Sequence, residues 1–207
     1  GDHLIRVRTC TATDDVLLVT RRGMCIRFPV SDVRLFSGRT STGVRGIRLD
    51  DTDDVIWMSM LHHVEIETDT RDAYLRQSNA LRRMDGEGEN LNDQSNGPTL
   101  PPEQFEMLAE HEQFVLAATA KGFGKRTSSY DYRTTKRGGK GIVNIDTDKR
   151  EDTVVATFPV ETADQIMLVT DGGQVIRCPV DDVRIASRRT QGVNLFDVEG
   201  DDEVVSV

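Results

Sequence analysis

Short runs of β-branched and other apolar residues alternate along the chain with polar turns that contain glycine. Val16–Thr20 and Ile166–Thr170 are two such runs, and they predict strands that are buried on both faces. Gly23 and Gly173 follow these runs and predict hairpin turns, because glycine adopts a positive φ without a Cβ clash. The pattern therefore predicts a β-rich fold assembled from hairpins.

The hairpin pattern occurs three times, in Asp14–Val44, Glu112–Ile142 and Asp164–Val193. Each copy has an apolar run, a glycine turn, a second run with one arginine, a basic loop and a closing Gly-Val or Gly-Ile pair. The aligned positions are the turn glycines Gly23, Gly122 and Gly173, the arginines Arg27, Arg126 and Arg177, and the loop glycines Gly43, Gly141 and Gly192. Units of about 50 residues with about four short strands each are typical of propeller blades.

The spacing of the copies indicates how the chain is divided. The turn glycines lie 51 residues apart between the second and third copies but 99 apart between the first and second. We therefore expect an all-β fold, a partial arc of three propeller-like blades with a short helical insertion. The expected segments are the end of a preceding blade (1–10), a blade (11–65), the insertion (66–111), and two further blades (112–160 and 161–207).

The insertion differs from the blades in composition. Arg71–Asp85 has apolar residues at helical spacing, and Pro102–Glu112 begins with proline and acidic residues, as helices often do. Between them, Gly86–Gly97 is polar and rich in glycine, which suits a mobile loop. We expect two helices on the periphery whose deletion leaves the blades folded and the binding of an anionic partner unweakened.

Charge is distributed unevenly along the chain. The net charge is −9, but residues 64–112 alone carry 12 acidic and 4 basic side chains. Residues 121–150 carry 9 basic and 3 acidic side chains, and residues 21–48 carry 7 arginines and one acid. The acidity therefore belongs to the insertion, where it should repel an anionic partner such as a nucleic acid, whereas the blades carry blocks of positive charge that should attract one.

Other features bound the class of protein. The three scattered cysteines, Cys10, Cys25 and Cys178, fit a reducing cytoplasm better than a disulfide framework. No stretch approaches the roughly 20 apolar residues of a membrane helix, so no membrane partner is expected. The chain begins at Gly1 without a methionine, and we expect it to be a piece of a longer protein.

No catalytic or metal-binding motif in the sequence is complete. Residues 136–141 resemble the end of a phosphate-binding loop, but Thr134 stands where glycine is needed and Gly141 where serine or threonine is needed. His62 and His63 are adjacent on an expected strand and should point to opposite faces, which disfavours a metal site. We expect no catalytic residue, metal or cofactor within this chain.

Four segments carry a specific resemblance: Thr42–Leu49, Gly122–Thr127, Asp164–Met167 and Arg189–Val193. They are similar to the blades of the DNA gyrase A C-terminal domain family, which forms a six-bladed propeller variant called a β-pinwheel. The resemblance implies that these units are the last three blades. The family's signature, Gln-Arg-Arg-Gly-Gly-Lys-Gly, belongs to the first blade, and Lys136–Gly141 is a close relative of it in a later blade.

The resemblance also implies a function. It implies wrapping of double-stranded DNA in support of negative supercoiling by a cytoplasmic type II topoisomerase that hydrolyses ATP. ATP and Mg²⁺ would then belong to the holoenzyme, a heterotetramer with the rest of the gyrase A protein and with the gyrase B protein. The alternatives are the C-terminal domain of the topoisomerase IV A protein and a protein-interaction propeller with no role in DNA binding.

Basic residues in the glycine-containing loops are the predicted DNA contacts, since exposed backbone and cations both bind phosphates without reading sequence. These residues are Arg39, Arg45, Lys136, Arg137, Lys140, Arg188 and Arg189. The aligned arginines Arg27, Arg126 and Arg177 have two interpretations, either structural pairing with acids between blades or DNA binding.

Overall fold

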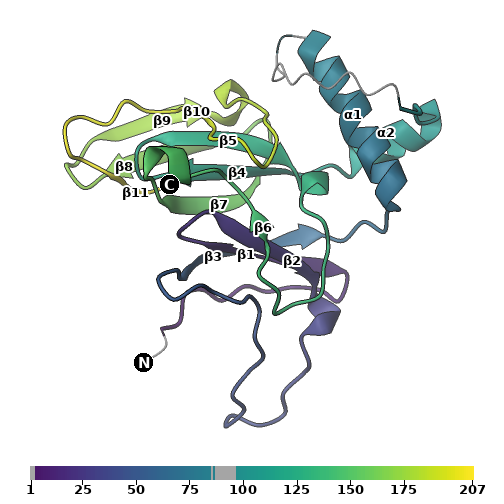
Figure 1. Cartoon of the computed structure of the whole chain (residues 1–207), viewed down its shortest axis with the longest axis horizontal. Helices are drawn as coiled ribbons and strands as arrows, with labels where there is room; N and C mark the ends of the chain where they lie inside the picture. The colour runs from purple at the N-terminus through teal and green to yellow at the C-terminus, as the bar shows by residue number, and fades with distance from the viewer. Residues whose placement is uncertain (1–2, 85, 87–96) are drawn as a thin grey trace.

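The computed structural model describes residues 3–84, 86 and 97–207 and consists mainly of three antiparallel sheets (Figure 1). This confirms the predicted all-β fold with a short helical insertion. The two predicted helices are present as α1 (Thr68–Met84) and α2 (Pro102–Glu110). Most of the predicted loop between them, together with Asp85, lies outside the described residues.

The first sheet has the strand order β3-β1-β2-β6. Its elements are β1 (Asp14–Thr20), β2 (Met24–Pro29), the 3-10 turn η1 (Val30–Asp32), β3 (Val55–His62) and β6 (Ile142–Val143). Gly23 joins β1 to β2 with a φ of +79°, as the sequence predicts for this turn. The buried face of β1 includes Leu17 and Val19, which are both fully buried.

The second sheet repeats this arrangement in the order β10-β5-β4-β7. Its elements are β4 (Phe114–Thr119), β5 (Phe123–Ser128), the 3-10 turns η2 (Ser129–Asp131) and η3 (Asp148–Arg150), β7 (Val154–Val160) and β10 (Val193–Asn194). The turn glycine, Gly122, has the same φ of +79° as Gly23. The two repeats therefore share their hairpin geometry as well as their sequence pattern.

The third sheet has the order β11-β8-β9 in the described part of the chain. Its elements are β8 (Gln165–Thr170), β9 (Val175–Pro179), the 3-10 turn η4 (Val180–Asp182) and β11 (Val204–Ser206). The hairpin turn again uses a glycine of positive φ, Gly173 at +87°.

Each of the two later repeats contributes one strand to the outer edge of the blade before it, and we call these two strands the exchanged strands. β6 belongs to the second repeat but pairs with β2 of the first, and β10 belongs to the third repeat but pairs with β5 of the second. Each exchanged strand follows a glycine, Gly141 or Gly192, where a Cβ would lie only 2.3 Å from the carbonyl oxygen of Cys25 or 2.6 Å from that of Gly124. The sequence predicts about four strands in each blade but does not reveal this exchange.

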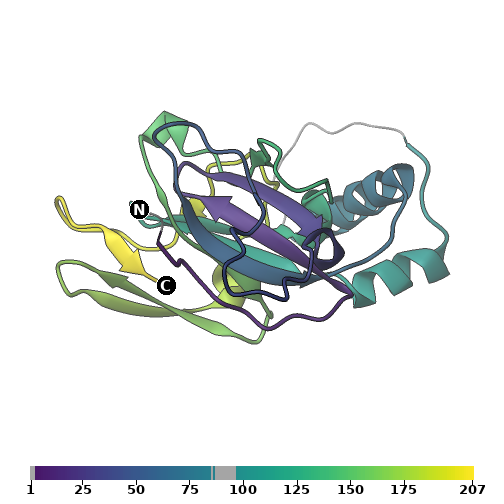
Figure 2. The same cartoon turned by 90° about the horizontal axis from the view of Figure 1, so that it is seen from below.

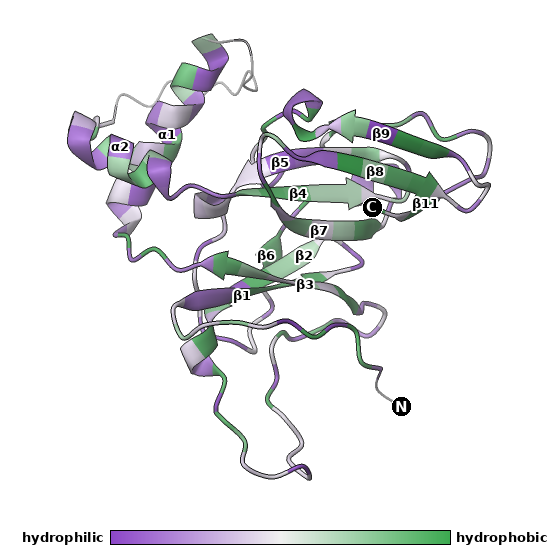
Figure 3. Ribbon diagram, turned by 180° about the vertical axis from the view of Figure 1, so that it is seen from behind, coloured by the Kyte–Doolittle hydropathy of each residue, from purple (hydrophilic) through white to green (hydrophobic). Residues whose placement is uncertain are grey.

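Two hydrophobic clusters fill the spaces between successive sheets. One joins Leu17 and Leu61 of the first sheet to Val115 and Val154 of the second, and the other joins residues such as Leu116 to Leu168 of the third. Figure 3 shows the hydrophobic residues concentrated on the strands, while both helices alternate between hydrophilic and hydrophobic positions. Burial of apolar strand faces between blades is therefore the main stabilising contribution.

The helix pair lies at one side of the sheets in both Figure 1 and Figure 2. It is attached by a small core in which Tyr74 of α1 and Leu108 of α2 cover Tyr130 of the second blade. All three are at most 3% exposed, and the Tyr130 hydroxyl donates to the Leu108 carbonyl oxygen over 2.8 Å. The insertion is therefore packed onto the second blade more firmly than the sequence suggests.

Candidate nucleic-acid interface

Each blade carries one basic loop after its first 3-10 turn, and in the second and third blades this loop runs along the hairpin of the preceding blade. We call them loop 1 (residues 33–48), loop 2 (residues 133–141) and loop 3 (residues 183–192). Loops 2 and 3 lead into the exchanged strands β6 and β10. They are thereby fixed at both ends to the fold.

Loop 2 is hydrogen-bonded to the first repeat along its length. The Thr135 amide donates to the Arg27 carbonyl oxygen over 2.8 Å. The Gly138 amide then donates to Gly46 over 2.5 Å, and the Arg48 amide donates to Gly139 over 2.8 Å. Loop 1 and loop 2 therefore form one continuous surface instead of two independent ones.

Loop 3 is held by the second repeat in a similar way. The Ala186 amide donates to the Arg126 carbonyl oxygen over 2.8 Å, and the Arg126 amide donates to Arg184 over 2.9 Å. In addition, the fully buried ammonium group of Lys125 donates to the carbonyl oxygens of Ser187 and Arg188, each over 2.6 Å. A lysine from one blade thus fixes the backbone of the next blade's loop.

The seven predicted contact residues fall into two groups. Those that are exposed are Arg39, Arg45, Lys136, Lys140 and Arg189. Arg137 and Arg188 are half-buried and their guanidinium groups bond to backbone carbonyls. Arg137 donates to Asp32 over 2.9 Å and to Arg45 over 3.1 Å, whereas Arg188 donates to Asp131 over 3.0 Å and also to Val143.

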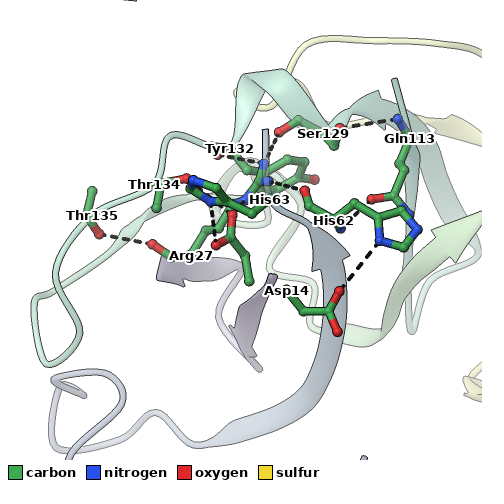
Figure 4. A network of polar contacts seen from close by, with 10 residues as sticks. Asp14, Arg27, His62, His63, Gln113, Ser129, Tyr132, Thr134 and Thr135 are labelled. Atoms are coloured by element: carbon green, nitrogen blue, oxygen red, sulfur yellow. Dashed lines mark hydrogen bonds and ion pairs between the residues drawn. The ribbon is translucent and has the colours of Figure 1, made fainter. Parts of the chain in front are cut away.

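Two of the three aligned arginines join their blade to the next one, and Figure 4 shows the contacts of the first, Arg27. Arg27 is 4% exposed and donates to Asp15 of its own blade over 2.7 Å and to the Ser129 carbonyl of the next blade over 2.8 Å. Arg126 donates to the Val183 carbonyl of the third blade over 2.6 Å, and it lies 3.6 Å from the Asp181 carboxylate. For these two residues the structure supports the structural interpretation.

The third aligned arginine is placed differently. Arg177 is exposed, and its guanidinium donates to the Gln165 side chain of its own blade. β9 is exposed at alternate positions, whereas β5 is buried along nearly its whole length. The same sequence position is therefore buried or exposed according to whether another blade covers it.

The adjacent histidines belong to the same polar network. His63 Nδ1 lies 2.9 Å from Asp15 Oδ1, and His62 is exposed with Nδ1 3.5 Å from Asp14 Oδ1. No group of three or more metal-ligating side chains gathers anywhere in residues 3–84, 86 or 97–207. Over the same residues, neither helix has the length and apolar character needed to cross a bilayer.

Two basic residues that form or support this surface, Arg133 and Lys125, were not among the predicted contacts. Arg133 is exposed at the start of loop 2, and the repeated pattern Asp-x-Arg, which ends in Arg34, Arg133 and Arg184, was a signal for it. Lys125 is fully buried, and isoleucine occupies the corresponding place in the other two repeats, Ile26 and Ile176. That alignment indicates a core position and gives no hint of a lysine clamp.

Three blades with exchanged outer strands and a basic loop on each define a propeller-like domain of the β-pinwheel class. A family model described as DNA gyrase C-terminal domain, beta-propeller, matches residues 14–61, 113–161 and 164–207, which are the three blades without the insertion. The chain therefore belongs to the DNA gyrase A C-terminal domain family.

Relatives along the whole chain agree with this assignment. The chain is 47% identical to the DNA gyrase A protein of Granulibacter bethesdensis over 100% of its own length. It is 42% identical to that of Rickettsia bellii over 99% of its own length. These alignments cover 24% and 23% of the relatives, so the chain spans about a quarter of their length.

Solved structures support the fold. The C-terminal domain of DNA topoisomerase IV matches with a TM-score of 0.64 at 17% identity, over 94% of this chain and 46% of that one. The E. coli ParC C-terminal domain matches with a TM-score of 0.54 at 14% identity, over 94% and 61% respectively. At these identities the likeness concerns the fold alone.

Proposed function

We propose that this chain binds double-stranded DNA without sequence preference and bends it along the rim that carries the basic loops. The observation that supports this most is the hydrogen bonding of loop 2 to loop 1 and of loop 3 to the second blade. These bonds hold cations of successive blades in fixed relative positions. Phosphate contacts carry no base information, so such binding should be indifferent to sequence.

Bending is what makes a repeated loop useful. A bend of 40–90° over a short duplex costs on the order of 1–6 kcal/mol, since DNA has a persistence length of about 50 nm. A single cluster of charge can hold the duplex but cannot curve it. Cations on successive blades can, because each new phosphate contact offsets the next increment of curvature.

In the longer context of its relatives, we propose that the chain supports ATP-dependent negative supercoiling by DNA gyrase. ATP, Mg²⁺, the rest of the gyrase A protein and the gyrase B protein would act outside these residues, in a cytoplasmic heterotetramer. The contribution of the chain is then to bind and bend the duplex, with Arg39, Arg45, Lys136, Lys140 and Arg189 as phosphate contacts and Arg137 and Arg188 as residues that shape the loops.

The test is the salt dependence of duplex binding. If about five phosphates are contacted, log K against log salt should have a slope of about −4 to −5, and the K136Q/K140Q double variant should flatten it by about 2. Arg137 is left in place because it ties loop 2 to loop 1. The R22Q/K149Q variant removes the same charge at exposed positions outside the loops and should behave like the parent.

Two results would contradict the proposal. Equal slopes for the parent and K136Q/K140Q would exclude loop 2 as a contact. A parent with no salt-sensitive binding would instead favour a protein-interaction role for the propeller.

A further inference from the structure

A cleft of about 470 Å³ lies where α1 meets loops 2 and 3. Four arginines line it: Arg71 from α1, Arg133 from loop 2, and Arg188 and Arg189 from loop 3. Asp72 and Asp131 are the carboxylates in the same lining. The cleft therefore combines side chains from the insertion and from two successive blades, with more cations than anions.

The four arginines of the cleft differ in how many contacts they make with the rest of the protein. Arg188 bonds to backbone carbonyls, and Arg71 lies 2.7 Å from Asp72, with 22% of its side chain exposed. Arg133 and Arg189 are exposed, and their guanidinium groups make no hydrogen bond or ion pair with the part of the chain that the structure describes. At least two guanidinium groups are thus available to a ligand.

The carboxylates weaken this positive charge only in part. Asp131 lines the cleft, and its burial raises its pKa while Arg188 and Arg71 act in the opposite direction. Its carboxylate also accepts the Arg188 amide over 3.4 Å. Asp131 therefore helps to position Arg188, and Arg188 offsets its negative charge.

Arg133, the first residue of loop 2, also lines two hollows next to the cleft. The smaller hollow is lined by Lys136 and Lys140 as well, and the other by Arg71 and His63. Cations consequently follow one another from loop 2 through Arg133 to Arg189 of loop 3. A duplex that passes from the second blade to the third would place a phosphate at this point.

We propose that this cleft binds a backbone phosphate of the duplex, with Arg71, Arg133 and Arg189 as its ligands. Bidentate guanidinium groups suit the tetrahedral anion. The inference rests on the proposed DNA binding and extends it to the insertion. α1 carries Arg71, Arg76, Arg82 and Arg83 against Asp69 and Asp72, so this helix is basic although the insertion as a whole is acidic.

The experiment measures duplex binding against salt for R71Q, R133Q and the R71Q/R133Q double variant. Because the arginines share one phosphate, which contributes about 0.9 to the slope, the double variant should flatten the slope by about 1 and each single substitution by less. R83Q is the matched control, because it removes an arginine of the same helix 12 residues further on, about 18 Å along its axis. It should leave the slope at the parent value.

A second arm separates a DNA phosphate from a free anion. The thermal stability of each variant is measured with and without added inorganic phosphate, and circular dichroism checks its fold. If R71Q fails to fold, R133Q/R189Q takes its place, since both side chains are exposed.

The possible results distinguish a failure of the cleft proposal from a failure of the proposed function. If R71Q/R133Q matches R83Q while K136Q/K140Q still flattens the slope, the cleft proposal is wrong and the proposed function stands. If inorganic phosphate stabilises the parent and not the double variant, yet the DNA slopes are equal, the cleft holds a free anion and the proposal is also wrong. If the parent shows no salt-sensitive binding, the proposed function itself fails.

Discussion

The strands β5 and β9 occupy the same place in the second and third blades, but their surroundings differ. β5 reads FGKRTS and is more polar than β9, which reads VIRCP. Even so, β5 is buried at five of its six positions, and β9 is exposed at alternate positions. Hydropathy alone would reverse this order.

The neighbouring blade explains the difference. Loop 3 covers β5 and offers backbone carbonyls to Lys125 and Arg126, which satisfies their charged groups on burial. No described residue plays this part for Arg177 of β9 beyond its own blade's Gln165. Burial in this fold is therefore a property of two adjacent repeats and not of one strand.

The largest expected effect separates Arg126 from Arg177. Arg126→Ala leaves the Val183 and Asp181 carbonyls without their donor and opens a void, so we expect a loss of about 2–4 kcal/mol in the free energy of unfolding. Arg177→Ala at the matching exposed position should cost less than about 0.5 kcal/mol. Urea unfolding of both variants measures the difference, and equal losses would refute the role of the neighbouring blade.

The turn glycines give a second, smaller contrast. A Cβ on Gly122 would lie 2.2 Å from the Phe196 carbonyl oxygen, whereas a Cβ on Gly173 meets nothing within 4 Å. Both have positive φ, so alanine costs about 1–2 kcal/mol at either position for the backbone alone. The Gly122→Ala variant should lose roughly a further 1–2 kcal/mol of unfolding free energy because of the clash. Matching melting temperatures for the two variants would contradict this.

Lys125 allows a test of the clamp on loop 3. Lys125→Ile introduces the residue found at this place in the other two repeats, but it removes the donor to Ser187 and Arg188. We expect a cost of about 1–3 kcal/mol and faster amide hydrogen exchange across residues 187–190. Ile176→Val in the third blade is the control. Unchanged exchange in loop 3 would show that Lys125 does not hold it.

The smallest effect concerns thiol reactivity and leaves stability unchanged. Cys25 lies on β2 and pairs with Ile142 of β6, and its burial raises its pKa to about 12. Burial also raises the pKa of the half-buried Cys178. The thiolate is the reactive form, so at pH 8 Cys25 is almost entirely in the unreactive thiol form. Alkylation followed by mass spectrometry should label exposed Cys10 first, then Cys178, and Cys25 only after unfolding. Early labelling of Cys25 would contradict the covered edge of the first blade.

Much of each blade was predictable because its signals are local. The apolar runs Val16–Thr20 and Ile166–Thr170 form most of β1 and β8, and the three turn glycines have the predicted positive φ. The strand exchange was not predictable, since β6 and β10 are two residues long and pair across repeats. For the same reason, the sequence left two interpretations of Arg126 open and gave no role to Lys125, because the contacts that bury both residues are distant in sequence.

The bending of the duplex by cations on successive blades, acting as one surface, can be measured directly. A duplex of about 30 base pairs, labelled with a fluorophore pair at its two ends, measures this directly by energy transfer. The parent chain is expected to bring the two ends closer together, and K136Q/K140Q at saturating concentration to do so less than R22Q/K149Q. An end-to-end distance that stays at the free value in the bound parent, or falls equally in both variants, would contradict this expectation.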